Sequence, residues 1–285
     1  MEGSGDIAIS KLAPGLYIVA TPIGHLGDIS LRALVTLSSV DRVACEDTRL
    51  TGLLLARYGI KKSLLSYHDH NADEKRLTLI KYLEAGEAIA LVSDAGMPLI
   101  ADPGYKLVRM CREEGYEVTV IPGANAALTA LAGSGLPTDR FLFVGFLPAK
   151  KAARQNALKE LQLPSATLIF YEAPQRLAAS LEDMVAIFGG ECQAVIAREL
   201  TKLYEETRRG SLLELVRYYS ENSPKGEIVI ILSPRHEVLL KNHDVEALLK
   251  EQLKTSSLRD AVAAITEMTG LKKGDVYKQA LALTR

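Results

Sequence analysis

The chain has few cysteines and little net charge. Three cysteines, Cys45, Cys111 and Cys192, are spread over 285 residues, and no CxxC pair occurs. This number and spacing argue against a disulfide framework and favour a reduced, cytoplasmic protein. The formal net charge of −1 excludes binding to nucleic acid through bulk positive charge, although a local basic patch remains compatible with it.

Long apolar runs and the common nucleotide-binding fingerprints are also missing. No stretch is long enough to cross a bilayer, so we expect no membrane association. The first ten residues are polar and contain glycine, which is typical of a loose terminus rather than a signal peptide. Neither GxGxxG nor a Walker A loop occurs, and Gly133-Ser134-Gly135 lacks the third glycine of the dinucleotide fingerprint.

What is present is a repeated alternation of apolar runs and helical patterns. With 48% hydrophobic and 24% charged residues, the composition is that of a soluble globular protein. The length suggests about two domains of roughly 100–200 residues each. The alternation predicts two α/β domains, over 14–134 and 140–234, joined by a linker near 133–140. Three short helical patterns then predict a small extension over 242–285.

The stretch 93–104, SDAGMPLIADPG, follows an apolar run at 88–92 that reads as a buried strand. Asp102-Pro103 is a suitable start for the helix expected next, with Asp102 as N-cap. Ligands of open α/β sheets bind at the carboxyl ends of strands, so this loop is a candidate ligand site. A tight turn whose carboxylates cap backbone groups is the alternative.

Other strand ends carry similar clusters. The loop 21–28 ends at Asp28, which we expect to cap a helix that buries Leu31, Leu34 and Leu37. Residues 45–49, CEDTR, could place a substrate or could form a helix cap with a surface ion pair. Small residues at 122–127 leave room for a ligand against helix N–H groups, or allow close packing of helix on sheet.

His68-Asp69-His70 is the only pattern that suggests a metal. Alternate residues of an extended segment lie on one side, but no third ligand stands nearby at a suitable spacing. We therefore expect no metal site and assign these residues to a polar loop or a substrate contact.

The second half repeats the pattern, with polar clusters at 150–154, 171–176 and 198–202 after strand-like runs. Beyond Arg235 no strand-like run remains, and the segments 245–253, 258–268 and 275–283 read as helices. Ser257 with Asp260 three residues later is close to a capping-box start. From Arg235 onward the chain has nine Lys/Arg against seven Asp/Glu, so this tail is mildly basic.

Several of these stretches together resemble one known family. YIVATPIGHLGD, ACEDTR, SDAGMPLIADPG, PGANAALTA, FYEAPQR and ARELTKLYEE are similar to segments of the tetrapyrrole methylase (class III methyltransferase) superfamily, and within it of the methyltransferases of small-subunit ribosomal RNA. The resemblance covers residues 15–232 and implies S-adenosylmethionine (SAM) as methyl donor, held between two α/β domains. It also implies 2′-O-methylation of a cytidine in the decoding region of 16S rRNA, inside the assembled small subunit, by a cytoplasmic homodimer that needs no metal.

The resemblance and the strand-end clusters together give the candidate residues. The cofactor-binding set is Pro22, Gly24, Asp94, Ala95, Gly96, Ile100, Asn125, Ala126, Tyr171, Leu200 and Gly226. The substrate-binding set, chosen because cations hold phosphates, is Arg49, Lys150, Arg154, Arg176 and Arg198. The catalytic set is Glu199, Asp47 and Lys202, with Glu172 as a further carboxylate. No single residue stands out as the general base.

Two other functions remain compatible with the sequence. A methyltransferase acting on a tetrapyrrole carbon would have no need of the basic loop at 150–154 or of the C-terminal helices. A non-catalytic RNA-binding or assembly module would have no need to bind SAM.

Overall fold

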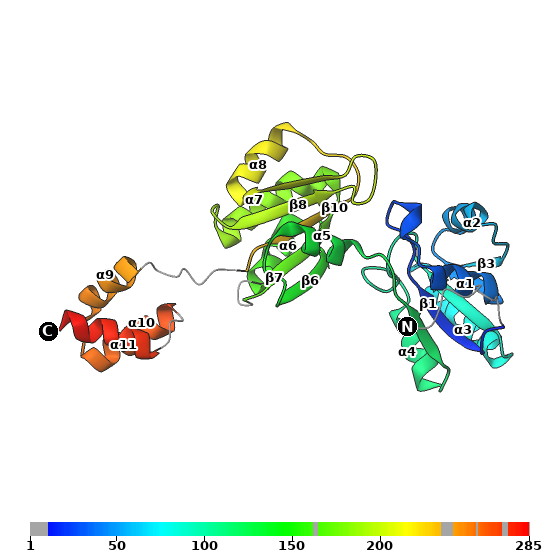
Figure 1. Ribbon diagram of the computed structural model, residues 1–285, viewed down its shortest axis with the longest axis horizontal. Helices are drawn as coiled ribbons and strands as arrows, with labels where there is room; N and C mark the ends of the chain where they lie inside the picture. The colour runs from blue at the N-terminus through cyan, green and yellow to red at the C-terminus, as the bar shows by residue number, and fades with distance from the viewer. Residues whose placement is uncertain (1–10, 162–164, 235–241, 255, 270–272, 285) are drawn as a thin grey trace.

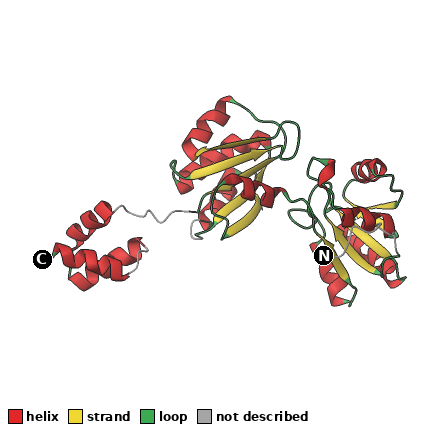
Figure 2. Ribbon diagram, viewed as in Figure 1, coloured by secondary structure: helices red, strands yellow, loops and turns green. Residues whose placement is uncertain are grey.

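The computed structural model describes residues 11–161, 165–234, 242–254, 256–269 and 273–284. It consists of two α/β lobes, each built on a five-stranded sheet, and a separate group of three helices (Figures 1 and 2). Among the described residues, no helix is long and apolar enough to cross a membrane.

The first sheet has the order β3-β2-β4-β1-β5, and all of its pairings are parallel. Helices cover both faces, which is why the central strands are continuously apolar and fully buried. Helices α3 and α4 pack on one face, α1 and α2 on the other. The strands are β1 (Gly15–Val19), β2 (Arg42–Cys45), β3 (Ser63–Ser66), β4 (Ala88–Val92) and β5 (Val118–Ile121), and the helices are α1 (Leu31–Ser39), α2 (Thr48–Arg57), α3 (Ala72–Glu84) and α4 (Tyr105–Glu113).

The second sheet is mixed, with the order β6-β7-β10-β8-β9. Only β6 and β7 pair in parallel, and the other three pairings are antiparallel. Helices α6, α7 and α8 cover one face. The strands are β6 (Phe141–Phe146), β7 (Thr167–Glu172), β8 (Gln193–Arg198), β9 (Glu206–Ser211) and β10 (Ile228–Leu232), and the helices are α6 (Lys151–Glu160), α7 (Leu177–Phe188) and α8 (Leu212–Glu221).

Helix α5 (Ala126–Ser134) covers the other face of the second sheet, although the sequence places it in the first domain. Its side chains Ala127, Ala130 and Leu131 pack against β7, β8 and β10. Alanines at these positions let the helix axis come close to the sheet. The expected linker at 133–140 therefore follows a helix that already packs with the second lobe.

Two predicted helix starts are wrong. Asp28 belongs to a short 3-10 helix, and the N-cap of α1 is Ser30, whose side chain accepts a hydrogen bond from the Ala33 backbone. Leu31, expected to be buried, is 66% exposed because α1 begins one residue after its cap, at Leu31. Helix α4 starts after Gly104 rather than after Asp102. Gly104 has a φ of +134°, and a Cβ there would lie 2.9 Å from Leu91 Cδ2, so only glycine fits.

The three predicted C-terminal helices are confirmed as α9 (Asn242–Gln252), α10 (Leu258–Thr269) and α11 (Lys273–Leu283). They form a small apolar core of their own, with Val245, Ile265 and Val276 fully buried. The Ser257 hydroxyl accepts a hydrogen bond from the Asp260 backbone, as the capping pattern predicted. The predicted stripe residue Leu271 and the cation Lys272 lie outside the described residues.

Candidate functional site

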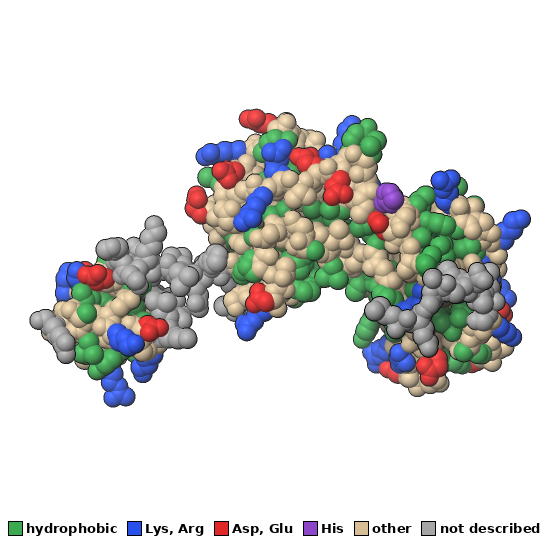
Figure 3. Space-filling model, in the orientation of Figure 1, with side chains coloured by type: hydrophobic (Ala, Val, Ile, Leu, Met, Phe, Trp, Pro, Cys, Tyr) green, Lys and Arg blue, Asp and Glu red, His purple; other side chains and the backbone are tan. Residues whose placement is uncertain are grey.

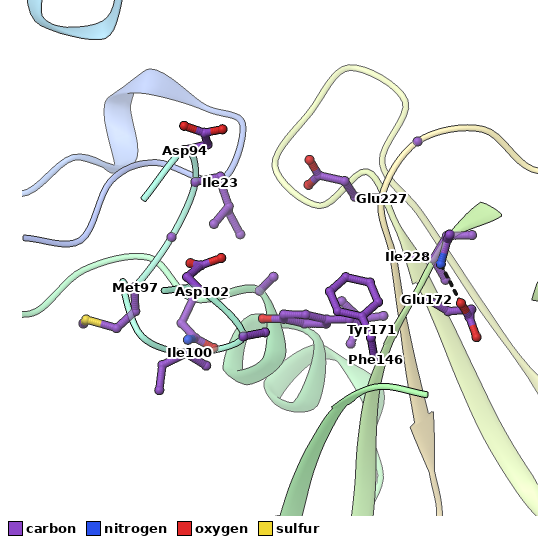
Figure 4. Close-up of a pocket in the computed structure, with 18 of the residues that line it drawn as sticks. Ile23, Asp94, Met97, Ile100, Asp102, Phe146, Tyr171, Glu172, Glu227 and Ile228 are labelled. Carbon is purple, nitrogen blue, oxygen red and sulfur yellow. Dashed lines mark hydrogen bonds between the residues drawn. The ribbon is translucent and has the colours of Figure 1, made fainter. Parts of the chain in front are cut away.

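A cavity of about 380 Å³ lies between the two lobes (Figure 4). It forms where β4, β6 and β7 end, where β10 begins and where α5 starts. Figure 3 shows hydrophobic side chains on both lobes where they face each other. The lining consists of Ile23, Glu46, Asp94, Ala95, Gly96, Met97, Ile100, Ala101, Asp102, Asn125, Ala126, Phe146, Tyr171, Glu172, Ala173, Pro174, Gly226, Glu227, Ile228 and Val229.

The loop after β4 forms one wall and has an unusual backbone. Gly96 exchanges backbone hydrogen bonds with Thr21, has a φ of +82°, and would place a Cβ 3.2 Å from Ile23 Cγ2. Leu99 and Ala101 also have positive φ, at 72° and 68°. Such residues cost roughly 1–3 kcal/mol each and persist where the surrounding structure holds them. The loop is therefore shaped for the cavity rather than for local stability.

This wall is acidic. β2 and β4 are neighbours whose following connections run to opposite sides of the sheet, which is where α/β folds bind ligands. Glu46 follows β2, and Asp94 and Asp102 follow β4, so the strand order brings three carboxylates together. Burial and the charges of Asp102 and Asp94 raise the pKa of Glu46 to about 7, and burial chiefly raises the pKa of Asp102 to about 6.

The opposite wall is aromatic. Figure 4 shows Tyr171 extending from β7 toward the β4 loop, beside Phe146 from the end of β6. The two ring centroids are 5.6 Å apart in an edge-on arrangement. The Tyr171 hydroxyl accepts a hydrogen bond of 3.2 Å from the Ala127 backbone, which anchors the start of α5, and burial raises the pKa of Tyr171.

Glu172 shapes the turn that follows β7. Its carboxylate is buried and accepts hydrogen bonds from the Ser180 hydroxyl and the Ala173 backbone, and it pairs with Arg176. Arg176 also donates to the Leu147 carbonyl. These bonds fix the Ala173-Pro174 turn against the cavity.

A segment at 199–205, here called the clasp, joins the lobes beside the cavity. The His25 backbone donates to the Thr201 hydroxyl at 3.0 Å, and Lys202 Nζ lies 2.9 Å from Glu199 and 3.2 Å from Glu227. The Glu227 backbone N–H and Lys202 lower the pKa of Glu199. Burial opposes the charge of Lys202, but its bonds to Glu199 and Glu227 leave its pKa raised. Both side chains are therefore charged in this arrangement.

A second hollow, of about 440 Å³, adjoins the cavity on the side of α2. It shares Ile23, Asp94, Ala95 and Glu227 with the cavity. Its other lining residues are Pro22, Gly24, Leu26, Leu50, Thr51, Leu53, Leu54, Arg57, Ser93 and Lys202.

The structure brings most of the predicted cofactor-binding residues together. Those that line the cavity are Asp94, Ala95, Gly96, Ile100, Asn125, Ala126, Tyr171 and Gly226. Pro22 and Gly24 line the second hollow, and Leu200 packs against the core under α5. The sequence sets miss Glu46, Asp102, Phe146 and Glu227. Position after a strand was a usable signal for Glu46 and Phe146, because each stands at or next to the end of a predicted apolar run.

The predicted catalytic and substrate residues are more scattered. Asp47 caps α2, and bonds from the Arg49 side chain and backbone lower its pKa to about 2, which makes it a weak base. Arg49 is 86% exposed. Arg198 pairs with Glu206, and Lys150 is exposed at the start of α6.

The prediction that Arg154 binds substrate is wrong. Its side chain is buried between α6 and α7, 4% exposed, and donates to Asp183 at 2.7 Å and to the Ala149 carbonyl. Gln155 donates to the other oxygen of Asp183. A guanidinium fully engaged inside the lobe ties two helices together and is out of reach of a substrate.

The His68-Asp69-His70 pattern gains no metal ligands in the structure. Asn71 caps the His68 backbone and its amide contacts the His68 ring. Within the described ranges, no three His, Cys, Asp or Glu side chains are grouped so that they could hold a metal ion.

Comparison with known proteins gives a consistent family. The family model "Tetrapyrrole (Corrin/Porphyrin) Methylases" matches residues 15–216, and "RsmI C-terminal HTH domain" matches residues 241–284. A relative from Mesorhizobium japonicum, "Ribosomal RNA small subunit methyltransferase I", is 47% identical over 99% of this chain and 97% of its own length. The Escherichia coli O157:H7 protein of the same name is 49% identical over 93% of this chain and 94% of its own length.

Solved structures agree in fold. A uroporphyrin-III C-methyltransferase from Thermus thermophilus, complexed with S-adenyl homocysteine, superposes with a TM-score of 0.55 at 18% identity, covering 77% of this chain and 97% of that one. A diphthine synthase gives a TM-score of 0.60 at 17% identity, covering 76% and 89%. At these identities the likeness concerns the fold alone.

Proposed function

We propose a function for a chain that belongs to the tetrapyrrole (corrin/porphyrin) methylase family, and within it to the methyltransferases of small-subunit ribosomal RNA. It is an rRNA methyltransferase of the small ribosomal subunit. We propose that SAM is its methyl donor and that the accepting atom is the ribose 2′-oxygen of a cytidine in 16S rRNA.

The observation that carries the proposal is the cavity between the lobes. Its volume of about 380 Å³ is within the range of roughly 300–1,000 Å³ for small-molecule sites. The chemistry of its two walls fits SAM, because carboxylates suit a ligand with cationic sulfonium and ammonium groups and ribose hydroxyls, and apolar side chains suit an adenine ring. Asp94, Asp102 and Glu46 would hold the polar groups, with Ile100 and Tyr171 against the apolar ones. When bound, SAM supplies an already activated methyl group.

The residues of the chain then position the acceptor and remove its proton. Asp94 and Glu227 line both the cavity and the second hollow, so their carboxylates have access to a hydroxyl placed where the two meet. We propose these two as candidates to accept the 2′-hydroxyl proton, with Glu199 and Lys202 holding Glu227 in place. Of the carboxylates predicted as catalytic, Asp47 is disfavoured by its bond to Arg49. Orientation of the two reactants can contribute about 7–11 kcal/mol of the rate enhancement.

Partners and location belong to the same proposal. The substrate is the rRNA within the assembled small subunit, the enzyme acts in the cytoplasm without a metal, and two copies associate as a homodimer. Arg49, Arg176, Arg198 and Lys150 remain candidates for phosphate contacts.

The test is methyl transfer from labelled SAM to three acceptors in parallel: undermethylated small ribosomal subunits, naked 16S rRNA, and a porphyrinoid precursor. We expect label in the subunit rRNA, in a nucleotide that resists alkaline cleavage because its 2′-oxygen is blocked. Label in the porphyrinoid alone would instead indicate a tetrapyrrole methylase. An absence of SAM binding would favour an assembly module without catalytic activity.

A further inference from the structure

We propose that the second hollow, between α2 and the clasp, receives the target nucleotide with its base turned out of the RNA and laid against the leucines of α2. This inference rests on the proposed function, because it assigns the subsite for the RNA substrate. Neither the family match nor the relatives assigns these residues a role.

Continuity between the hollow and the cavity is the first argument. Ile23, Asp94, Ala95 and Glu227 line both spaces, and the methyl donor and the accepting ribose have to meet. With the donor in the narrower, acidic cavity, the ribose lies at these shared residues. The base and its phosphates then extend into the wider hollow toward α2.

The chemistry of the α2 wall is the second argument. Leu50 and Leu53 are 50% and 71% exposed on the same helix, and Leu54 lines the hollow beside them. Clustered apolar side chains left open to water mark a surface that another molecule covers. The flat, apolar face of a nucleobase fits such a wall, and sequence-specific RNA recognition commonly uses bases that are unstacked and splayed out.

Charge complementarity is the third argument, and it favours a nucleotide over a neutral ligand. Arg57 and Lys202 line the hollow, and Arg49 stands exposed at the start of the same helix. The Arg49–Asp47 pair is exposed, and such pairs are worth only about 0–1 kcal/mol, so a phosphate can compete for the guanidinium. The hollow thus combines an apolar wall for a base with cations for its phosphates.

The experiment compares Leu53→Glu with a matched control, Leu77→Glu. Leu77 is 57% exposed on α3 of the same lobe and lines neither the cavity nor the second hollow. For each protein, SAM affinity is measured by calorimetry and kcat/KM by methylation of undermethylated small subunits. We expect Leu53→Glu to keep its SAM affinity and to lose about tenfold or more in kcat/KM, because a carboxylate then faces the nucleotide, whereas Leu77→Glu matches the wild type.

Leu53→Ala is a second variant that keeps an uncharged helix surface, and we expect a smaller loss in the same direction. Wild-type kcat/KM in Leu53→Glu would overturn the proposal. A loss of activity together with a change from dimer to monomer in light scattering would also overturn it, because α2 would then be an interface between copies. Failure of the wild-type protein itself to methylate subunits would refute the proposed function, and it is read separately from the variants.

Discussion

Replacement of Glu46 by Gln tests the electrostatics of the acidic wall. Glu46 is partly buried beside Asp94 and Asp102, which together with burial raise its pKa from 4.5 to about 7. At about 1.4 kcal/mol per pKa unit, that interval corresponds to about 3 kcal/mol, and partial contact with water reduces it to about 1–2 kcal/mol. The folded state pays this cost whenever Glu46 is ionised.

The sign follows from proton binding. Because the folded protein holds the Glu46 proton more tightly than the unfolded chain does, the cost is absent below pH 4.5, grows as the pH rises, and is complete above about pH 7. Without ligand, Glu46→Gln should therefore be more stable than wild type by about 1–2 kcal/mol at pH 8, and the two should be nearly equal at pH 4.5.

The assay is urea unfolding followed by circular dichroism across that pH range. Glu74→Gln is the control, because Glu74 is 79% exposed on α3 and outside the cavity lining, and it should show no such pH-dependent gain. A stability difference between Glu46→Gln and wild type that is the same at pH 4.5 and pH 8 would refute the reasoning.

Three further predictions follow from the site. Gly96→Val should weaken SAM binding by about tenfold or more, measured by calorimetry, while the circular dichroism spectrum stays unchanged, because the side chain would be strained at a φ of +82° and crowd Ile23; unchanged affinity would remove this loop from the site. Arg49→Ala and Lys202→Ala should each bind SAM normally but lose most methylation of small subunits, since one removes an exposed cation and the other the support of Glu199 and Glu227; full activity in both would refute these roles. A chain ending at Pro234 should fold and bind SAM, since the cores of both lobes lie before that residue, but should bind subunits more weakly; its slope of log affinity against log salt should be shallower by about one unit per lost phosphate contact, and an unchanged slope would make the C-terminal helices purely structural.

The sequence predicted the cavity well where the fold rule for strand ends applies. Buried strands such as β4 and β7 are visible as apolar runs, and parallel packing brings the residues that follow them to one edge. Asp94 and Tyr171 could be placed on this basis alone. Edge strand β9 was not predicted, because its residues ETRRGS alternate between buried and exposed positions without an apolar run.

Arg154 shows why single charged residues were predicted less well. It stands near Lys150 and Lys151 in the sequence, so it reads as part of a basic loop. Its helix turns the side chain inward, onto Asp183 of α7, 29 positions further along the chain. An ion pair of this kind depends on how two helices pack, and neither partner carries a local pattern that reveals the other.

Helix α5 carries the same reasoning to the level of the whole site. The linker pattern after it suggested that it belongs with the first sheet, yet its alanines pack on the second. Its first residues, Asn125 and Ala126, nevertheless line the cavity opposite the β4 loop, and Tyr171 of the second sheet bonds to the backbone of Ala127. The segment that leaves β5 of the first sheet thus becomes a helix of the second lobe exactly beside the cavity. Any change in the relative position of the lobes must therefore move the start of α5 and the clasp together, which makes the shape of the cavity a property of both lobes.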